Sequence, residues 1–126
     1  MGINLGMANQ VKVFEYGGCS TCRKALKFLD ARRVPYRKIA IVEAPPSKTE
    51  LKKMLVFLGG DIKRLFNTSG VEYRTRKMSE KLPKMSEEQA IAQLAGCGKL
   101  IKRPFVLTDK AGLVGFKEEE WKRIFK

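Results

Sequence analysis

Apolar and polar positions alternate along residues 11–16 (VKVFEY), and this period of two, in residues that favour β-structure, predicts a strand. Two glycines follow it and permit a tight turn. From residue 20 or 21 the apolar positions recur at helical spacing, which predicts a helix to about Arg32 with one buried stripe of Cys22, Ala25, Leu26 and Leu29. The segment YRKIAIV, after Val34 and Pro35, is the next predicted strand. The chain therefore opens as β-α-β.

The middle of the chain, residues 47–98, carries the signals of several helices. Ser47 and Glu50 have the spacing of a capping box at a helix start, and Ser86 and Gln89 repeat this pattern. A glycine pair at positions 59 and 60 predicts the end of the first helix. The apolar face of that helix is expected to consist of Leu51, Leu55 and Leu58. The segment DIKRLFN predicts a short helix capped by Asp61, and a basic, less regular stretch follows it.

The end of the chain predicts a β-hairpin and a helix. Residues 105–108 and 113–116 form the two arms of the hairpin, and residues 109–112 form its turn. The segment KEEEWKRIFK has acidic residues in its first turn and basic residues in its last, as the helix dipole prefers. Its apolar residues are expected to pack onto the sheet; they are Trp121, Ile124 and Phe125.

This order of elements predicts an α/β protein. Without the helical block, β-α-β followed by β-β-α is the order of a thioredoxin-like fold, and Cys-x-x-Cys stands where that fold carries its redox pair. The 126 residues, 44% of them hydrophobic, suffice for one domain with a core. We expect a single domain, residues 1–126, with a thioredoxin-like core (11–42 and 99–126) and a helical insertion (47–98).

The amino-acid composition excludes several classes of catalytic and metal site. The chain has no histidine, which excludes Ser-His-Asp and Cys-His mechanisms and every zinc site with an imidazole ligand. Three cysteines leave a four-cysteine zinc site one ligand short, so a metal would need a carboxylate or a second protein chain. We expect no metal and no bound cofactor.

The chain is expected to act in the cytoplasm, away from membranes. No apolar run approaches the roughly 18 residues that cross a bilayer, and the start, MGINLGMANQ, lacks the pattern of a secretory signal. The formal net charge of +13 favours anionic partners such as oxyanions, nucleic acid or acidic proteins. The basic residues are spread along the chain, so many of them simply form solvated faces.

The cysteine pair is the main candidate site. Cys19 is expected at the helix N-terminus, where exposed N–H groups and the helix dipole stabilise a thiolate, and Arg23 adds positive charge nearby. Cys22 lies on the buried stripe, which suits either a core residue or a resolving thiol that attacks once Cys19 is oxidised. Cys97, between two glycines, is either a small helix-terminal residue or a third redox thiol.

A second feature lies in LIKRPF, before the third predicted strand. Pro104 occupies the place where a thioredoxin-like fold has a proline, usually cis, that faces the thiol. Arg103 is then placed to direct its guanidinium, a planar fork of donors, toward an anion at Cys19. The alternative is a surface arginine beside a strand.

With these segments in place, the chain resembles the arsenate reductase and Spx family of thioredoxin-like proteins. The matching segments are CSTCRKAL, DIKRLFN, LIKRPFV and GLVGFKEEEW, which together span about residues 11–125.

The resemblance to arsenate reductases implies that Cys19 attacks arsenate and that arginines hold the oxyanion. Arg103 matches the arginine before the proline; a second family arginine falls at or near Lys63, with Arg64 adjacent, and a third falls where this chain has Gly115 and Phe116. In that family the second thiol comes from glutathione, glutaredoxin or the protein itself, and here Cys22 makes an internal disulfide possible. The external donor would be thioredoxin or glutathione with glutaredoxin, and we expect a monomer.

The Cys-x-x-Cys pair and the glycine in the final strand look more like the Spx side of the family. Those proteins bind the C-terminal domain of the RNA polymerase alpha subunit, and they use the disulfide as a redox switch on transcription. The sequence thus leaves three hypotheses: an arsenate reductase-like oxidoreductase, an Spx-like regulator, and a redox-silent adaptor.

Overall fold

The computed structural model describes residues 10–125, which contain a four-stranded mixed sheet of order β2-β1-β3-β4. Strand β1 (Val11–Glu15) runs parallel to β2 (Tyr36–Ala40) and antiparallel to β3 (Phe105–Leu107). Strand β4 (Gly112–Val114) forms the hairpin with β3. The first nine residues, on which the expectation about a secretory signal partly depends, lie outside the described residues.

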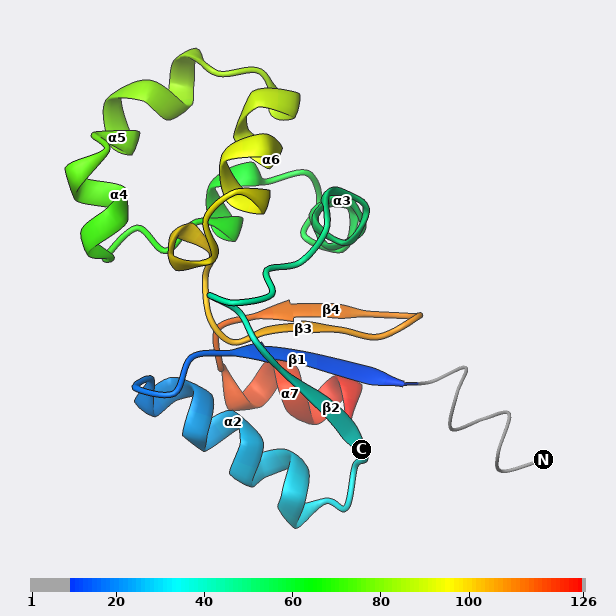
Figure 1. Cartoon of the computed structure of the whole chain (residues 1–126). Helices are drawn as coiled ribbons and strands as arrows, with labels where there is room; N and C mark the ends of the chain where they lie inside the picture. Colours follow the sequence, from blue (N-terminus) through cyan, green and yellow to red (C-terminus); the bar gives the residue numbers. More distant parts are fainter. Residues whose placement is uncertain (1–9, 126) are drawn as a thin grey trace.

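Helices cover both faces of the sheet (Figure 1). Helices α2 (Ser20–Ala31) and α7 (Glu118–Ile124) lie on one face, and the helical block lies on the other. That block consists of α3 (Lys48–Phe57), α4 (Val71–Thr75), α5 (Met78–Lys81) and α6 (Glu87–Ala95), with 3-10 turns η1 (Ile62–Leu65), η2 (Leu82–Lys84) and η3 (Gly98–Leu100). The predicted α/β class, with a thioredoxin-like order of elements and helices between its two halves, is confirmed.

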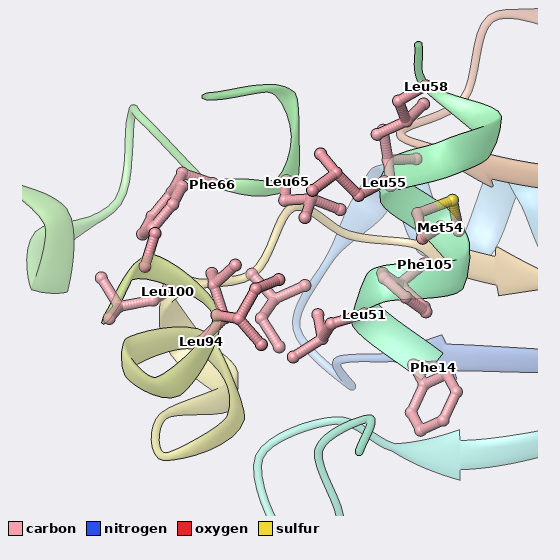
Figure 2. Close-up of a cluster of buried hydrophobic side chains, with 14 of the residues drawn as sticks. Phe14, Leu51, Met54, Leu55, Leu58, Leu65, Phe66, Leu94, Leu100 and Phe105 are labelled. Atoms are coloured by element: carbon pink, nitrogen blue, oxygen red, sulfur yellow. The ribbon is translucent and has the colours of Figure 1, made fainter. Parts of the chain in front are cut away.

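Strand alternation divides the hydrophobic core into two layers. Phe14 and Phe105 face the helical block, where their rings pack edge to face 5.4 Å apart near Leu51 of α3 (Figure 2). Their neighbours in the strands, Val13 and Val106, face the other way. That second layer contains Ala25, Phe28, Leu29, Leu113, Trp121 and Phe125. Strands β1, β3 and β4 therefore contribute buried residues to the core, whereas the residues of β2 are exposed or only partly buried.

The predicted capping boxes are both present. The Ser47 hydroxyl accepts a hydrogen bond from the Glu50 amide at 3.1 Å, and the Glu50 carboxylate accepts one from the Ser47 amide at 2.9 Å. Ser86 and Gln89 repeat this exchange at 3.1 and 2.9 Å. Helix α3 ends just before Gly59, whose φ of +70° lies in the left-handed region.

Three local predictions were wrong, and a fourth, the short helix that starts at Asp61, is confirmed except for its side-chain cap. Ile124 is 42% exposed and does not pack onto the sheet. Phe28 is buried on α2, whereas Leu26 is only partly buried. The turn after Asp61 is a 3-10 helix, and the Asp61 side chain forms no cap hydrogen bond. Strand β4 ends at Val114 instead of residue 116, because Gly115 has a φ of +71° and turns the chain.

Within the described residues, no helix combines the length and the apolar character that a membrane crossing requires.

Candidate thiol redox site

Cys19 is the N-cap of α2. Strand β1 ends at Glu15, and the chain turns so that the Cys19 amide donates to the Tyr16 carbonyl at 3.0 Å. The Cys19 sulfur, which is partly exposed, accepts a hydrogen bond from the Cys22 amide at 3.2 Å. A sulfur thus occupies the place that a serine or aspartate oxygen usually takes at a helix start. The Cys19 sulfur is therefore accessible at the start of the helix, where it can act as a nucleophile.

Cys22 lies in the first turn of α2 with none of its surface exposed. Burial raises the pKa of the Cys22 thiol to about 12. The Cys19 sulfur adds to this rise in pKa, both as a hydrogen-bond partner of Cys22 and as a like charge. At neutral pH Cys22 is therefore a thiol rather than a thiolate, and the two cysteines are chemically unequal.

Arg103 lies at the same end of the sheet, immediately before β3. The Arg103–Pro104 peptide bond is cis. The guanidinium carbon of Arg103 lies 4.8 Å from the centroid of the Tyr16 ring, and Nη1 makes a long hydrogen bond of 3.5 Å to the Lys99 carbonyl. Tyr16 therefore contacts both Arg103 and Cys19. Its ring packs on the Arg103 guanidinium, and its carbonyl accepts a hydrogen bond from the Cys19 amide.

A cleft of about 330 Å³ opens beside the Arg103 guanidinium. Besides Arg103, its lining residues are Tyr16, Asn67, Gly70, Val71, Glu72 and Lys99. Lys99 adds a second positive charge to the cleft, while the Glu72 carboxylate is engaged by Arg76 at 3.0 Å. The cleft thus offers donors and positive charge to an anion.

Lys63 and Arg64 line a different cleft, together with Lys102 and Lys117. Lys102, which lines this cleft, and Arg103, which lines the other, are neighbours in the chain. Arg23 is exposed on α2, and its amide donates to the Cys19 carbonyl at 3.2 Å. The roles of Lys63, Arg64 and Arg23 as oxyanion ligands at Cys19 stay predictions.

Cys97 is the N-cap of η3 and is partly buried against the core of the helical block. Its amide donates to the Leu94 carbonyl at 3.1 Å, which continues the end of α6. A third redox role for Cys97 stays a prediction. Among residues 10–125, no three Cys, Asp or Glu side chains gather where they could hold a metal ion.

The sequence did not single out Tyr16 or Lys99 as part of the site. Tyr16 occupies the last position of the predicted strand, which gives no hint that its ring will meet a side chain from the far end of the chain. Such a contact depends on strand order in the sheet, which periodicity does not encode.

Comparison with known proteins decides the family. A family model described as the ArsC family matches residues 14–124. The chain belongs to the ArsC family. The family predicted from the four motifs is thereby confirmed.

Several ArsC family structures and sequences are similar over almost the whole chain. An ArsC family related protein from Bacteroides fragilis is 46% identical, with a TM-score of 0.87, and the match covers 93% of this chain and 98% of that one. A protein of Streptococcus mutans UA159, described as a possible arsenate reductase, is 33% identical, with a TM-score of 0.82 and coverage of 90% and 98%. YusI of Bacillus subtilis, described as uncharacterized, is 45% identical over 106 residues, which cover 84% of this chain and 90% of YusI.

More distant relatives are regulators. The global transcriptional regulator Spx of Listeria monocytogenes is 25% identical over 113 residues, covering 90% of this chain and 85% of Spx. The regulatory protein MgsR of Bacillus subtilis is 22% identical over 120 residues, covering 95% and 94%. The proteins to which this chain is similar thus include a possible arsenate reductase and proteins described as regulators.

Proposed function

We propose that this protein is a cytoplasmic, monomeric, thiol-dependent oxidoreductase of the arsenate reductase type, with Cys19 as nucleophile and Cys22 as resolving thiol. The observation that carries the proposal is the inequality of the two thiols. The Cys19 sulfur accepts a hydrogen bond from a backbone amide at the start of a helix, whereas Cys22 is buried and its pKa is raised to about 12. Cys19 is thus accessible for nucleophilic attack, and Cys22 is buried and keeps its proton.

In the first step, the Cys19 sulfur attacks the arsenic of a dihydrogen arsenate ion. A sulfur–arsenic bond forms, an arsenic–oxygen bond breaks, and the oxygen leaves as water with the thiol proton and one arsenate proton. Arg103, at the cis-proline beside Tyr16, is the proposed ligand for the oxyanion, because a guanidinium offers paired donors to adjacent oxygens.

In the second step, the Cys22 sulfur attacks the Cys19 sulfur. The disulfide forms as the sulfur–arsenic bond breaks, its two electrons reduce As(V) to As(III), and the proton of Cys22 leaves with arsenite. In the adduct the Cys19 sulfur is bound to As(V), which makes this sulfur an electrophile. The adduct therefore gives the Cys22 thiol a target for attack that the resting protein lacks.

The disulfide must then be reduced by an external thiol, for which we propose thioredoxin or glutathione with glutaredoxin. No bound cofactor is needed, because each turnover passes two electrons from an external dithiol, or two monothiols, to the arsenic.

Turnover with two different donors tests this proposal. Purified protein is given arsenate and NADPH, coupled either to thioredoxin and its reductase or to glutathione, glutaredoxin and glutathione reductase. We expect arsenite with at least one donor system and loss of activity with Cys19→Ser. With Cys22→Ser, turnover with thioredoxin should be lost, because the internal disulfide cannot form, while glutathione can still resolve the adduct. No turnover with either system would contradict the enzymatic proposal.

A second candidate function is favoured by the Spx and MgsR relatives. In this alternative the Cys19–Cys22 pair is a redox switch on binding to the alpha subunit of RNA polymerase. Binding of the purified C-terminal domain of that polymerase subunit is measured with the protein reduced and oxidised, and the double variant Cys19→Ser, Cys22→Ser is the control. We expect affinity to change with oxidation in the native protein and to stay constant in the double variant. If neither redox form binds the polymerase domain, this alternative fails.

A further inference from the structure

Four basic side chains from three segments line one surface cleft of about 260 Å³. They are Lys63, Arg64, Lys102 and Lys117. We propose that this cleft is a second anion site, which takes a phosphate-class oxyanion, either free or as a monoester. The inference goes beyond the proposed function, because neither Cys19 nor Arg103 lines this cleft.

Backbone hydrogen bonds fix the segments that carry three of these side chains. Phe66 and Ile101 form an isolated antiparallel bridge. On either side of it, the Lys102 amide donates to the Leu65 carbonyl at 2.8 Å, and the Asn67 amide donates to the Leu100 carbonyl at 2.7 Å. Leu65 and Phe66 are anchored in the core of the helical block (Figure 2). The backbone positions of Lys63, Arg64 and Lys102 are therefore set by hydrogen-bonded and buried neighbours.

Gly115 leaves room for the Lys102 side chain. A Cβ atom at position 115 would lie 3.2 Å from the Lys102 Cε, so the lysine stem runs close over the glycine backbone. Gly115 is itself held in place, because its amide donates to the Pro104 carbonyl and its carbonyl accepts from the indole of Trp121 at 3.2 Å. A side chain here would crowd the ammonium group that Lys102 brings to the cleft.

In the described part of the chain, no ion pair neutralises the basic side chains of this cleft. Among the described residues, none of the four basic side chains forms an ion pair, and Asp61 is the only carboxylate in the lining. Of the neighbouring glutamates at the start of α7, Glu118 is paired with Lys122. Thr68 adds a hydroxyl donor to the lining. Several cations and one hydroxyl around a small polar hollow suit a doubly charged oxyanion with several acceptor oxygens.

Amide NMR of the full chain tests the proposal. The Cys19→Ser variant is used so that no thiol chemistry occurs, and it is titrated with inorganic phosphate in one arm and glycerol phosphate in the other. We expect the amide signals of Thr68 and Gly115 to shift most in at least one arm, and the tighter arm identifies the source. Lys102→Gln and Lys117→Gln should each weaken binding about fivefold, the upper end for an exposed ion pair.

Lys84→Gln is the matched control, since Lys84 is exposed on η2 and outside this cleft. It removes the same charge but should leave the dissociation constant unchanged. The proposal is overturned if Lys84→Gln weakens binding as much as Lys102→Gln, if shifts centre on Asn67 and Gly70 beside Arg103, or if neither anion shifts any amide. None of these outcomes bears on arsenate turnover by Cys19, which is assayed separately.

Discussion

At the scale of single residues, the proposed chemistry depends on two cysteines one helical turn apart in different environments. Cys19 is partly exposed and is the N-cap of α2, whereas Cys22 in the first turn has no exposed surface. The first turn of α2 thus leaves one sulfur accessible and hydrogen-bonded to an amide, and it buries the other, whose pKa is raised.

Alkylation should reveal this difference as a dependence on pH. Because the pKa of Cys22 is raised to about 12, its thiolate fraction at pH 8 is smaller than that of an ordinary thiol, and it grows only as the pH rises toward that value. We expect iodoacetamide to modify Cys19 first in the native protein and to modify Cys22 slowly until strongly alkaline pH, as measured by peptide mass spectrometry. In urea both should react at similar rates. Equal native rates at pH 8 would contradict the asymmetry.

Tyr16 is expected to position Arg103 without touching the reacting atoms. The ring supports the guanidinium through a cation–π contact. Tyr16→Leu should raise the KM for arsenate about two- to fivefold, the equivalent of an exposed cation–π contact, with little change in kcat. Tyr16→Phe keeps the ring and should restore the native KM. If the leucine and phenylalanine variants behave alike, the ring does not position the arginine.

At the scale of elements, the helical block is locked to the sheet where η3 meets the end of β2. Gly98, at the start of η3, is buried against the backbone that follows β2. A Cβ atom there would overlap the Ile41 carbonyl oxygen and would lie 2.7 Å from the carbonyl carbon and 3.0 Å from the Val42 Cα. Only a residue without a side chain permits this contact between the two halves of the chain.

Gly98→Ala should therefore destabilise the protein by about 1–3 kcal/mol or more, as overpacking against backbone does. The matched control is Gly96→Ala, on the other side of Cys97, where the added Cβ meets its nearest atom at 3.4 Å. Urea unfolding monitored by Trp121 fluorescence measures both. Similar free energies of unfolding for the two variants would show that the close approach at Gly98 is not a constraint.

At the scale of the whole molecule, the sequence predicted the order of elements well, because each carries a local signal. The capping boxes at Ser47 and Ser86 and the hairpin turn follow from neighbouring residues. The sequence did not predict which basic residues lie together. Lys102 and Arg103, for example, are adjacent in the chain yet line separate clefts. Which basic residues meet depends on the bridge between η1 and the segment before β3, a contact between distant parts of the chain.

A single turnover without any external thiol tests whether Cys19 and Cys22 together reduce arsenate. Fully reduced protein is mixed with arsenate, and arsenite and the cysteine state are measured after quenching. We expect about one arsenite per protein molecule, with Cys19 and Cys22 joined in a disulfide and Cys97 still free by peptide mapping. Protein that forms no arsenite, or that forms arsenite while Cys22 keeps a free thiol, would contradict this mechanism.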